Sequence, residues 1–180
     1  MWSDRLALII LAGLTAPASA EPRHFDFGRT PTPAEIAARD IDVRADGQGL
    51  PPGEGSVAQG RVIFAETCAA CHGEKGQGGL ADRLAGGFGT LKDTNPVRTV
   101  GSYWPYATSL FDYVRRAMPF NAPESLSNDQ VYAVSAYVLS LNGILPGDAT
   151  LNAGTLPGIV MPNRNGFISP DPRPDVPVKP

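Results

Sequence analysis

Apolar residues recur at helical spacing in three stretches of the chain. Two of these stretches open with a capping box, in which a serine and a glutamine stand three residues apart, at Ser56–Gln59 and Ser127–Gln130. The third stretch lies between them, at residues 108–117, and has two arginines near its end, where they suit the helix dipole. The apolar positions are Val57, Gly60, Ile63 and Phe64; Leu110, Phe111, Val114 and Ala117; and Val131, Val134, Tyr137, Val138 and Leu141. We therefore predict three main helices and an all-α fold.

The regions that flank these helices differ from them in composition. Residues 21–54 form a polar, proline-containing arm, in which Thr32 and Pro33 suit the start of one short helix and the rest is expected to be irregular. Residues 146–180 are rich in proline, which favours an extended or polyproline-like tail. Such a tail can be disordered, wrap its own domain or dock on a partner. Residues 55–145 are the expected domain.

The amino terminus has the pattern of an export signal. Arg5 precedes a short apolar run, and Ala18-Ser19-Ala20 matches the small-residue pattern at which signal peptides are cleaved. The apolar run is too short to span a bilayer. We expect a signal peptide at residues 1–20, cleavage after Ala20 and a periplasmic location.

Charge and hydropathy narrow the classes of partner. The 180-residue chain carries a formal net charge of −3, without a basic run or interleaved basic and aromatic residues, so nucleic acid is excluded as an expected partner. Beyond the signal, no stretch is apolar for long enough to cross a membrane, so the mature chain is expected to have no membrane span.

The motif that indicates a cofactor lies at the end of the first predicted helix, in Cys68-Ala69-Ala70-Cys71-His72. This is the C-x-x-C-H box through which a c-type haem is attached. The two thiols lie on one helical turn and can reach the two vinyl groups of one haem. His72 follows directly and is the expected axial ligand of the iron. One box indicates one covalently bound haem c.

Two other uses of the cysteines compete with haem attachment. A structural zinc site needs four ligands, and only His72 and His24 remain as nitrogen donors. A thioredoxin-like disulfide belongs in a βαβ pattern, whereas Cys68 and Cys71 stand at a helix end in a strand-poor sequence. The haem interpretation is therefore favoured.

Met118 is the expected second axial ligand. Pro119 follows it and disfavours helical geometry at residue 118, so the second predicted helix should end there and leave the thioether on a loop. Met161 also precedes a proline but lies in the tail, and His24 lies in the arm. Both remain alternatives, as does an open site, and either methionine can instead fill an apolar gap.

These residues resemble a class I cytochrome c. Gly60, Phe64 and Cys68 are spaced by fours, and the aromatic Tyr137 lies in the last helix. In that family a small residue and an aromatic on the first helix pack across the last helix. The resemblance implies three main helices around one covalently attached haem, and it implies that Met118 is the second axial ligand of the iron.

A narrower resemblance spans roughly residues 57–178. Its carriers are residues 99–106, 110–120 and 161–167, which are similar to the cytochrome subunits of sulfite dehydrogenase and of Sox-type sulfane dehydrogenase. In those systems a molybdenum-containing subunit oxidises a sulfur compound and passes electrons to the cytochrome. The resemblance implies such a dehydrogenase as donor and a downstream cytochrome or oxidase as acceptor.

Aromatic and basic residues before and within the second predicted helix are candidates for contacts with the haem propionates. They are Tyr103, Trp104, Tyr106 and Arg116. Ordinary packing of the aromatics and a solvated helix end for the arginine are the alternatives. The sequence has no Gly-Pro soon after the haem box, so it does not name the carbonyl that orients His72.

We therefore expect an electron-transfer protein that is not an enzyme by itself, because two axial ligands leave the iron no site for substrate. The alternatives are a peroxidase-like haem enzyme with an open distal site, a general soluble electron carrier unrelated to sulfur oxidation, and a docking subunit that uses its proline-rich tail. No distal acid–base pair is obvious for the enzyme.

Overall fold

The computed structural model describes residues 27–168. The expected signal peptide, its cleavage site after Ala20, and His24 lie outside the described residues, as does the tail from residue 169. The described elements run in the order α1 (Pro33–Arg39), β1 (Glu54–Ser56), α2 (Val57–Thr67), α3 (Ala69–His72), η1 (Thr90–Lys92), α4 (Ala107–Ala117), α5 (Asn128–Leu141), β2 (Thr150–Asn152) and η2 (Leu156–Gly158).

Local chemistry sets the helix boundaries where the sequence predicts them. Ser56 caps α2 and Ser127 caps α5, and in both capping boxes the glutamine side chain accepts a hydrogen bond from the serine backbone N–H. Thr32 and Glu35 form the same arrangement at the start of α1. Helix α4 begins at Ala107, one residue before the predicted start, and Met118 ends it in an extended conformation. The three predicted main helices are α2, α4 and α5.

Helices α2 and α5 cross with their backbones in contact at Gly60. A Cβ atom on Gly60 would lie only 1.9 Å from the carbonyl oxygen of Ala133. One turn further on, the rings of Phe64 and Tyr137 pack with their centroids 5.2 Å apart. The contact that the sequence predicts between the first and last main helices is therefore present.

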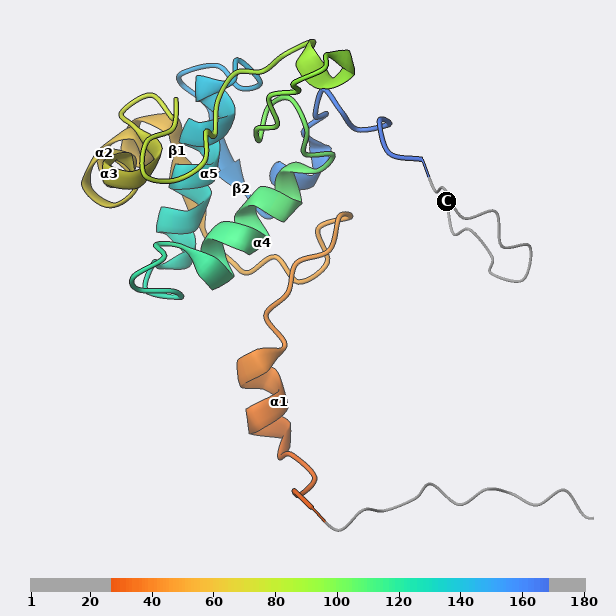
Figure 1. Ribbon diagram of the computed structural model, residues 1–180. Coiled ribbons are helices and arrows are strands. Elements are labelled where there is room, and N and C mark those ends of the chain that lie inside the picture. The colour runs from red at the N-terminus through yellow and green to blue at the C-terminus, as the bar shows by residue number, and fades with distance from the viewer. Residues whose placement is uncertain (1–26, 169–180) are drawn as a thin grey trace, which may run out of the picture.

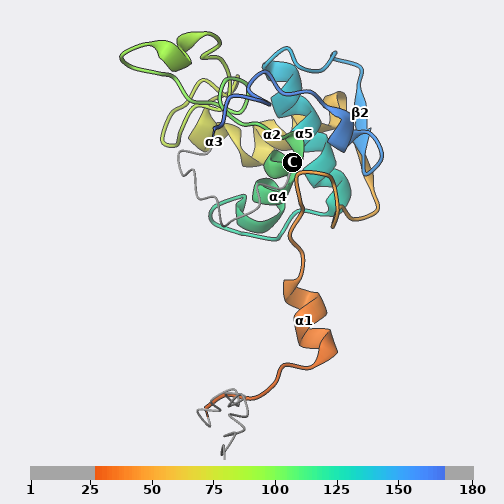
Figure 2. The same ribbon diagram turned by 90° about the vertical axis from the view of Figure 1, so that its right-hand side faces the viewer.

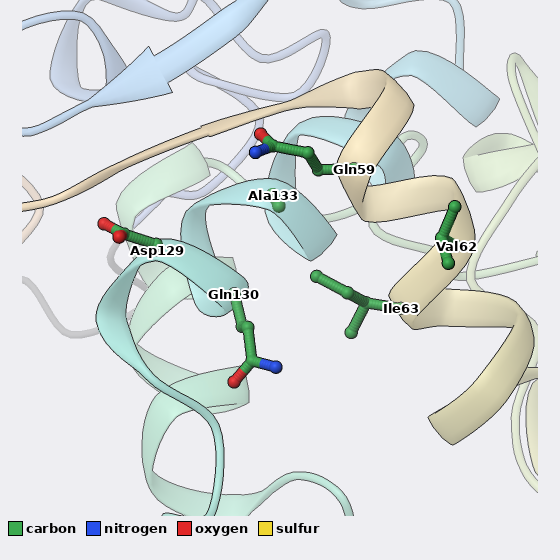
Figure 3. Close-up of a pocket in the computed structure, with 6 residues that line it drawn as sticks. All are labelled: Gln59, Val62, Ile63, Asp129, Gln130 and Ala133. Atoms are coloured by element: carbon green, nitrogen blue, oxygen red, sulfur yellow. The ribbon is translucent and has the colours of Figure 1, made fainter.

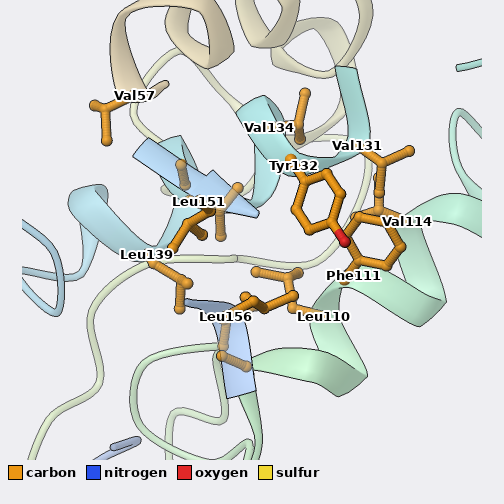
Figure 4. Close-up of a cluster of buried hydrophobic side chains, with 14 of the residues drawn as sticks. Val57, Leu110, Phe111, Val114, Val131, Tyr132, Val134, Leu139, Leu151 and Leu156 are labelled. Atoms are coloured by element: carbon orange, nitrogen blue, oxygen red, sulfur yellow. The ribbon is translucent and has the colours of Figure 1, made fainter. Parts of the chain in front are cut away.

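Helices α4 and α5 form the other half of the core. Phe111 and Tyr132 lie side by side (Figure 4), and their ring centroids are 4.4 Å apart. The buried Tyr132 hydroxyl donates a hydrogen bond of 2.9 Å to the Pro51 carbonyl, and burial raises the pKa of this phenol. The same cluster contains Leu151 and Leu156 from the carboxyl-terminal segment.

Residues 41–53 of the arm pack along α4 and α5. The carboxylate of Asp112 accepts a hydrogen bond of 2.8 Å from the Val43 backbone N–H, and Arg115 donates to the Ile41 carbonyl at 2.9 Å. Helix α1 precedes this segment, has no buried residue and projects away from the body of the protein (Figures 1 and 2).

The described part of the proline-rich tail wraps its own domain. Strand β2 pairs antiparallel with β1, with Gly55 opposite Leu151. Leu151, Leu156 and Met161 are almost completely buried. This short two-stranded sheet has no counterpart in the sequence pattern. Pairing is possible because Pro157 and Pro162 fall outside β2, so every residue of the strand keeps its backbone N–H.

In the part of the chain that the structure describes, the helices are too short or too polar to cross a bilayer.

The α2–α5 crossing predicts a specific cost for adding one methyl group. Gly60→Ala places its Cβ against the backbone of Ala133, which cannot move away as a side chain would, so the free energy of unfolding should fall by about 1–3 kcal/mol. Gly147→Ala is the matched control, because its Cβ has no neighbour within 4 Å, and it should change stability by no more than about 0.5 kcal/mol. Urea unfolding of the two haem-loaded variants measures both. Equal stabilities would contradict the close crossing.

Candidate haem site

One cavity of about 980 Å³ brings together the residues predicted to hold the cofactor. Cys68, Cys71 and His72 line it from the end of α2 and from α3, and Met118 lines it from the end of α4. Its volume lies at the upper end of the range for small-molecule and cofactor sites. The apolar wall includes Phe64, Leu110, Val114, Val134 and Val138. A large apolar site with a few grouped donors suits a macrocycle with a central metal.

The two cysteines occupy one turn at a break in the helix. Helix α2 ends at Cys68, and the short α3 carries the chain from Ala69 to His72, with the His72 N–H bonded to the Cys68 carbonyl at 3.0 Å. Gly73 then turns the chain with a φ of 80°. The predicted helix is thus interrupted, but the cysteines keep the spacing of one turn.

Burial raises the pKa of the Cys68 thiol. Cysteines that exchange disulfides rapidly have a lowered pKa, because the thiolate is the reactive form. The surroundings of Cys68 therefore do not favour a redox dithiol, which was the competing interpretation of the pair.

The imidazole of His72 is oriented by a backbone carbonyl that the sequence did not identify. Its Nδ1 lies 2.7 Å from the carbonyl oxygen of Asp82. A carbonyl only accepts hydrogen bonds, so Nδ1 carries the proton and Nε2 keeps the lone pair that a metal needs. Such a bond also raises the basicity of the imidazole as a ligand. No sequence motif marked Asp82, which lies ten residues further along the chain.

Met118 and Met161 have different surroundings. Met118 is half-buried on the cavity wall and has φ −122° and ψ 147°, the extended geometry expected before Pro119. Met161 is 1% exposed and belongs to the hydrophobic core. Its position matches the gap-filling alternative, whereas Met118 lines the same cavity as the two cysteines and His72.

The predicted propionate contacts divide into two groups. Trp104 lines the cavity and meets Tyr113 edge to face, with centroids 5.8 Å apart. Tyr103, Tyr106 and Arg116 do not line it. The Arg116 guanidinium instead bonds the Asp112 carboxylate, which raises the pKa of this arginine.

Two arginines that the sequence did not identify, Arg83 and Arg98, line the cavity. Arg83 donates a hydrogen bond of 3.1 Å to the Gln77 carbonyl, whereas Arg98 meets an aromatic side chain. The Arg98 guanidinium lies 5.5 Å from the centre of the Tyr103 ring, so Tyr103 flanks this arginine. Tyr106 is similarly covered by Arg164, at 4.3 Å. Arg98 directly precedes the aromatic-rich run at residues 99–106, which is the one signal that marked it.

A smaller cavity, of about 340 Å³, lies between α2 and α5 (Figure 3). Val62 and Ile63 line it from α2, and Gln130 and Ala133 line it from α5. It contains neither cysteine and neither predicted axial ligand.

Known proteins share both the sequence and the shape of this chain. Residues 57–142 match the family model for cytochrome c. The crystal structure of the sulfane dehydrogenase SoxCD from Paracoccus pantotrophus contains a chain with 46% sequence identity and a TM-score of 0.77. The match covers 83% of this chain and 74% of that chain.

These similarities confirm the expected class I cytochrome c fold and the resemblance to Sox-type cytochromes. The chain belongs to the cytochrome c family, and its cofactor is a covalently attached haem c.

Proposed function

We propose that this cytochrome is a periplasmic, single-haem electron carrier that serves as the electron-accepting subunit or partner of a molybdenum-containing dehydrogenase. The donor would oxidise a sulfur compound, sulfite or a sulfane, and the electrons would pass to a downstream cytochrome or oxidase. The observation that carries the proposal is the single cavity lined by Cys68, Cys71, His72 and Met118.

Each of these residues has one task in the proposal. When bound, haem c supplies an iron that cycles between the ferric and ferrous states. Cys68 and Cys71 hold the macrocycle through thioether bonds, and His72 offers Nε2 because its Nδ1–H is held by Asp82. Met118 offers a thioether, which favours the ferrous state and raises the reduction potential. With His72 and Met118 both holding the iron, no position would remain for a substrate, so the chain would transfer electrons without catalysing a reaction of its own.

The link to sulfur oxidation is supported by the 46% identity to a chain of a sulfane dehydrogenase. Export is supported by the sequence of residues 1–20, which has the pattern of a signal peptide.

Replacing Met118 should open one axial position. The reduced wild-type protein is expected not to bind carbon monoxide at neutral pH, whereas Met118→Ala should bind it and have a lower reduction potential, because the thioether no longer favours the ferrous state. Met161→Leu is the matched control, since Met161 is buried in the core and leucine has a similar volume. Optical spectra under carbon monoxide measure the outcome. Ready binding by the wild type would favour the peroxidase-like alternative, and an opened site in Met161→Leu would transfer the ligand role to Met161.

Arg98 should influence the reduction potential, and Arg116 should not. Arg98 lines the cavity, so Arg98→Gln removes a positive charge that favours the reduced centre and should lower the potential. Arg116→Gln is the control, because that guanidinium is already paired with Asp112. Spectroelectrochemical titration of both variants gives the comparison. If Arg116→Gln lowers the reduction potential more than Arg98→Gln does, Arg116 would be the residue that contacts the propionates.

Electron donation by a sulfur-oxidising molybdoenzyme is the most specific part of the proposal. We expect the haem to be reduced when the cytochrome is mixed anaerobically with such a dehydrogenase and its sulfur substrate, and to stay oxidised when either is left out. The absorbance of the reduced cytochrome follows the reaction. Equal reduction by an unrelated periplasmic dehydrogenase would instead indicate a general electron carrier.

A further inference from the structure

We propose that Asn142 is a positioning residue for His72 and that it acts through the loop at residues 82–86. This inference rests on the proposed role of His72 as an iron ligand. It concerns what keeps the imidazole oriented, which the haem box itself does not determine.

The side chain of Asn142 is buried at the end of α5, with 5% of its surface exposed, and both its amide nitrogen and its amide oxygen are hydrogen-bonded. Its Nδ2 donates to the Leu84 carbonyl at 3.1 Å and to the Val138 carbonyl at 2.9 Å. Its Oδ1 accepts a hydrogen bond of 3.1 Å from the Gly86 N–H. One side chain therefore fixes two backbone groups of the loop to the last helix.

The loop that Asn142 holds contains the carbonyl that binds His72. Asp82 lies two residues before Leu84, and on its other side the Ala81 N–H bonds the Cys71 carbonyl at 2.9 Å. The backbone is therefore fixed to the haem box before Asp82 and to α5 after it. Without Asn142 the attachment to α5 is lost. The backbone after Asp82 then keeps hydrogen bonds from the Leu84 and Ala85 N–H groups to the Gly76 carbonyl, at 2.8 and 3.0 Å, which join it to the glycine-rich loop and not to α5.

A second side chain and a close wall keep this arrangement in place. Thr99, which lines the haem cavity, donates from Oγ1 to the Gly86 carbonyl at 2.7 Å. A Cβ on Gly101 would lie 2.2 Å from Oδ1 of Asn142, so the backbone at residue 101 packs directly against the amide. Asn142 has no room to swing away from the loop on that side.

The hydrogen bond at His72 Nδ1 reports on this function directly. A well-placed carbonyl orients the ring, raises its basicity and protects the Nδ1–H from exchange with water. A carbonyl that moves breaks this bond more often, even when the rest of the fold is intact. The exchange rate of this one proton therefore separates positioning of His72 from a general effect on stability.

The test compares two asparagines of the same helix in the haem-loaded, reduced protein. Asn142→Ala should speed exchange of the His72 Nδ1–H by about tenfold, the effect of losing roughly one hydrogen bond's worth of local stability. Asn128→Ala is the matched control, since Asn128 also donates to a loop carbonyl, that of Pro52 at 3.3 Å, but at the opposite end of α5. It should leave this exchange rate unchanged. Nuclear magnetic resonance measures both.

A second variant covers the case in which Asn142→Ala does not fold. Asn142→Asp keeps the size of the side chain and an acceptor for the Gly86 N–H but removes the donor to the Leu84 carbonyl, so it should also speed the exchange. Unchanged exchange in a folded Asn142 variant, or equal acceleration in Asn128→Ala, would overturn the proposal. Wild-type spectra test the proposed ligand separately, because an unligated His72 would lack the strong ring-current shifts of a haem axial ligand. If the sulfur-oxidising dehydrogenase does not reduce the cytochrome, the exchange measurements on His72 still stand.

Discussion

Helix α2 delivers the haem box to the cavity because its backbone lies directly on α5. Gly60 has no side chain, and the carbonyl of Ala133 occupies the space that a Cβ would fill. Phe64 then packs on Tyr137 one turn later, and Cys68 follows after one more turn. A wider separation of the helices would move the end of α2, and with it both cysteines, away from the wall that Val134 and Val138 form. The position of the cofactor site is thus set by a contact that involves none of its ligands.

The predicted ligands of the haem site are held in two ways: some share one helical turn, and others depend on separate segments of the chain. The cysteines and His72 lie on a single helical turn, so their mutual arrangement is fixed by the backbone. The orientation of the imidazole depends on Asp82, and the position of Met118 depends on where α4 ends. Each part is held by a different segment of the chain, and apolar side chains line the cavity between them.

The sequence predicted what depends on neighbouring residues. Capping boxes placed the starts of α2 and α5, and the proline after Met118 placed the end of α4, because both effects act within a few residues. The sequence could not show that Arg98, and not Arg116, lies beside the haem cavity. Arg116 is held by Asp112, whose carboxylate also binds the arm at Val43, and that contact joins residues far apart in the chain. The pairing of Gly55 with Leu151 was missed for the same reason, and the Asp82 carbonyl was missed because no motif marks it in the glycine-rich loop after the haem box.

The pairing of β1 with β2 also bears on the order in which the domain is completed. Strand β1 directly precedes the helix that carries the haem box, yet its partner lies beyond the last main helix. Leu156 and Met161 enter the core from still later in the chain. Contacts between such distant segments form late and slow folding, since a long loop must close first. The start of α2 therefore gains its final support only when residues 150–152 have paired with β1.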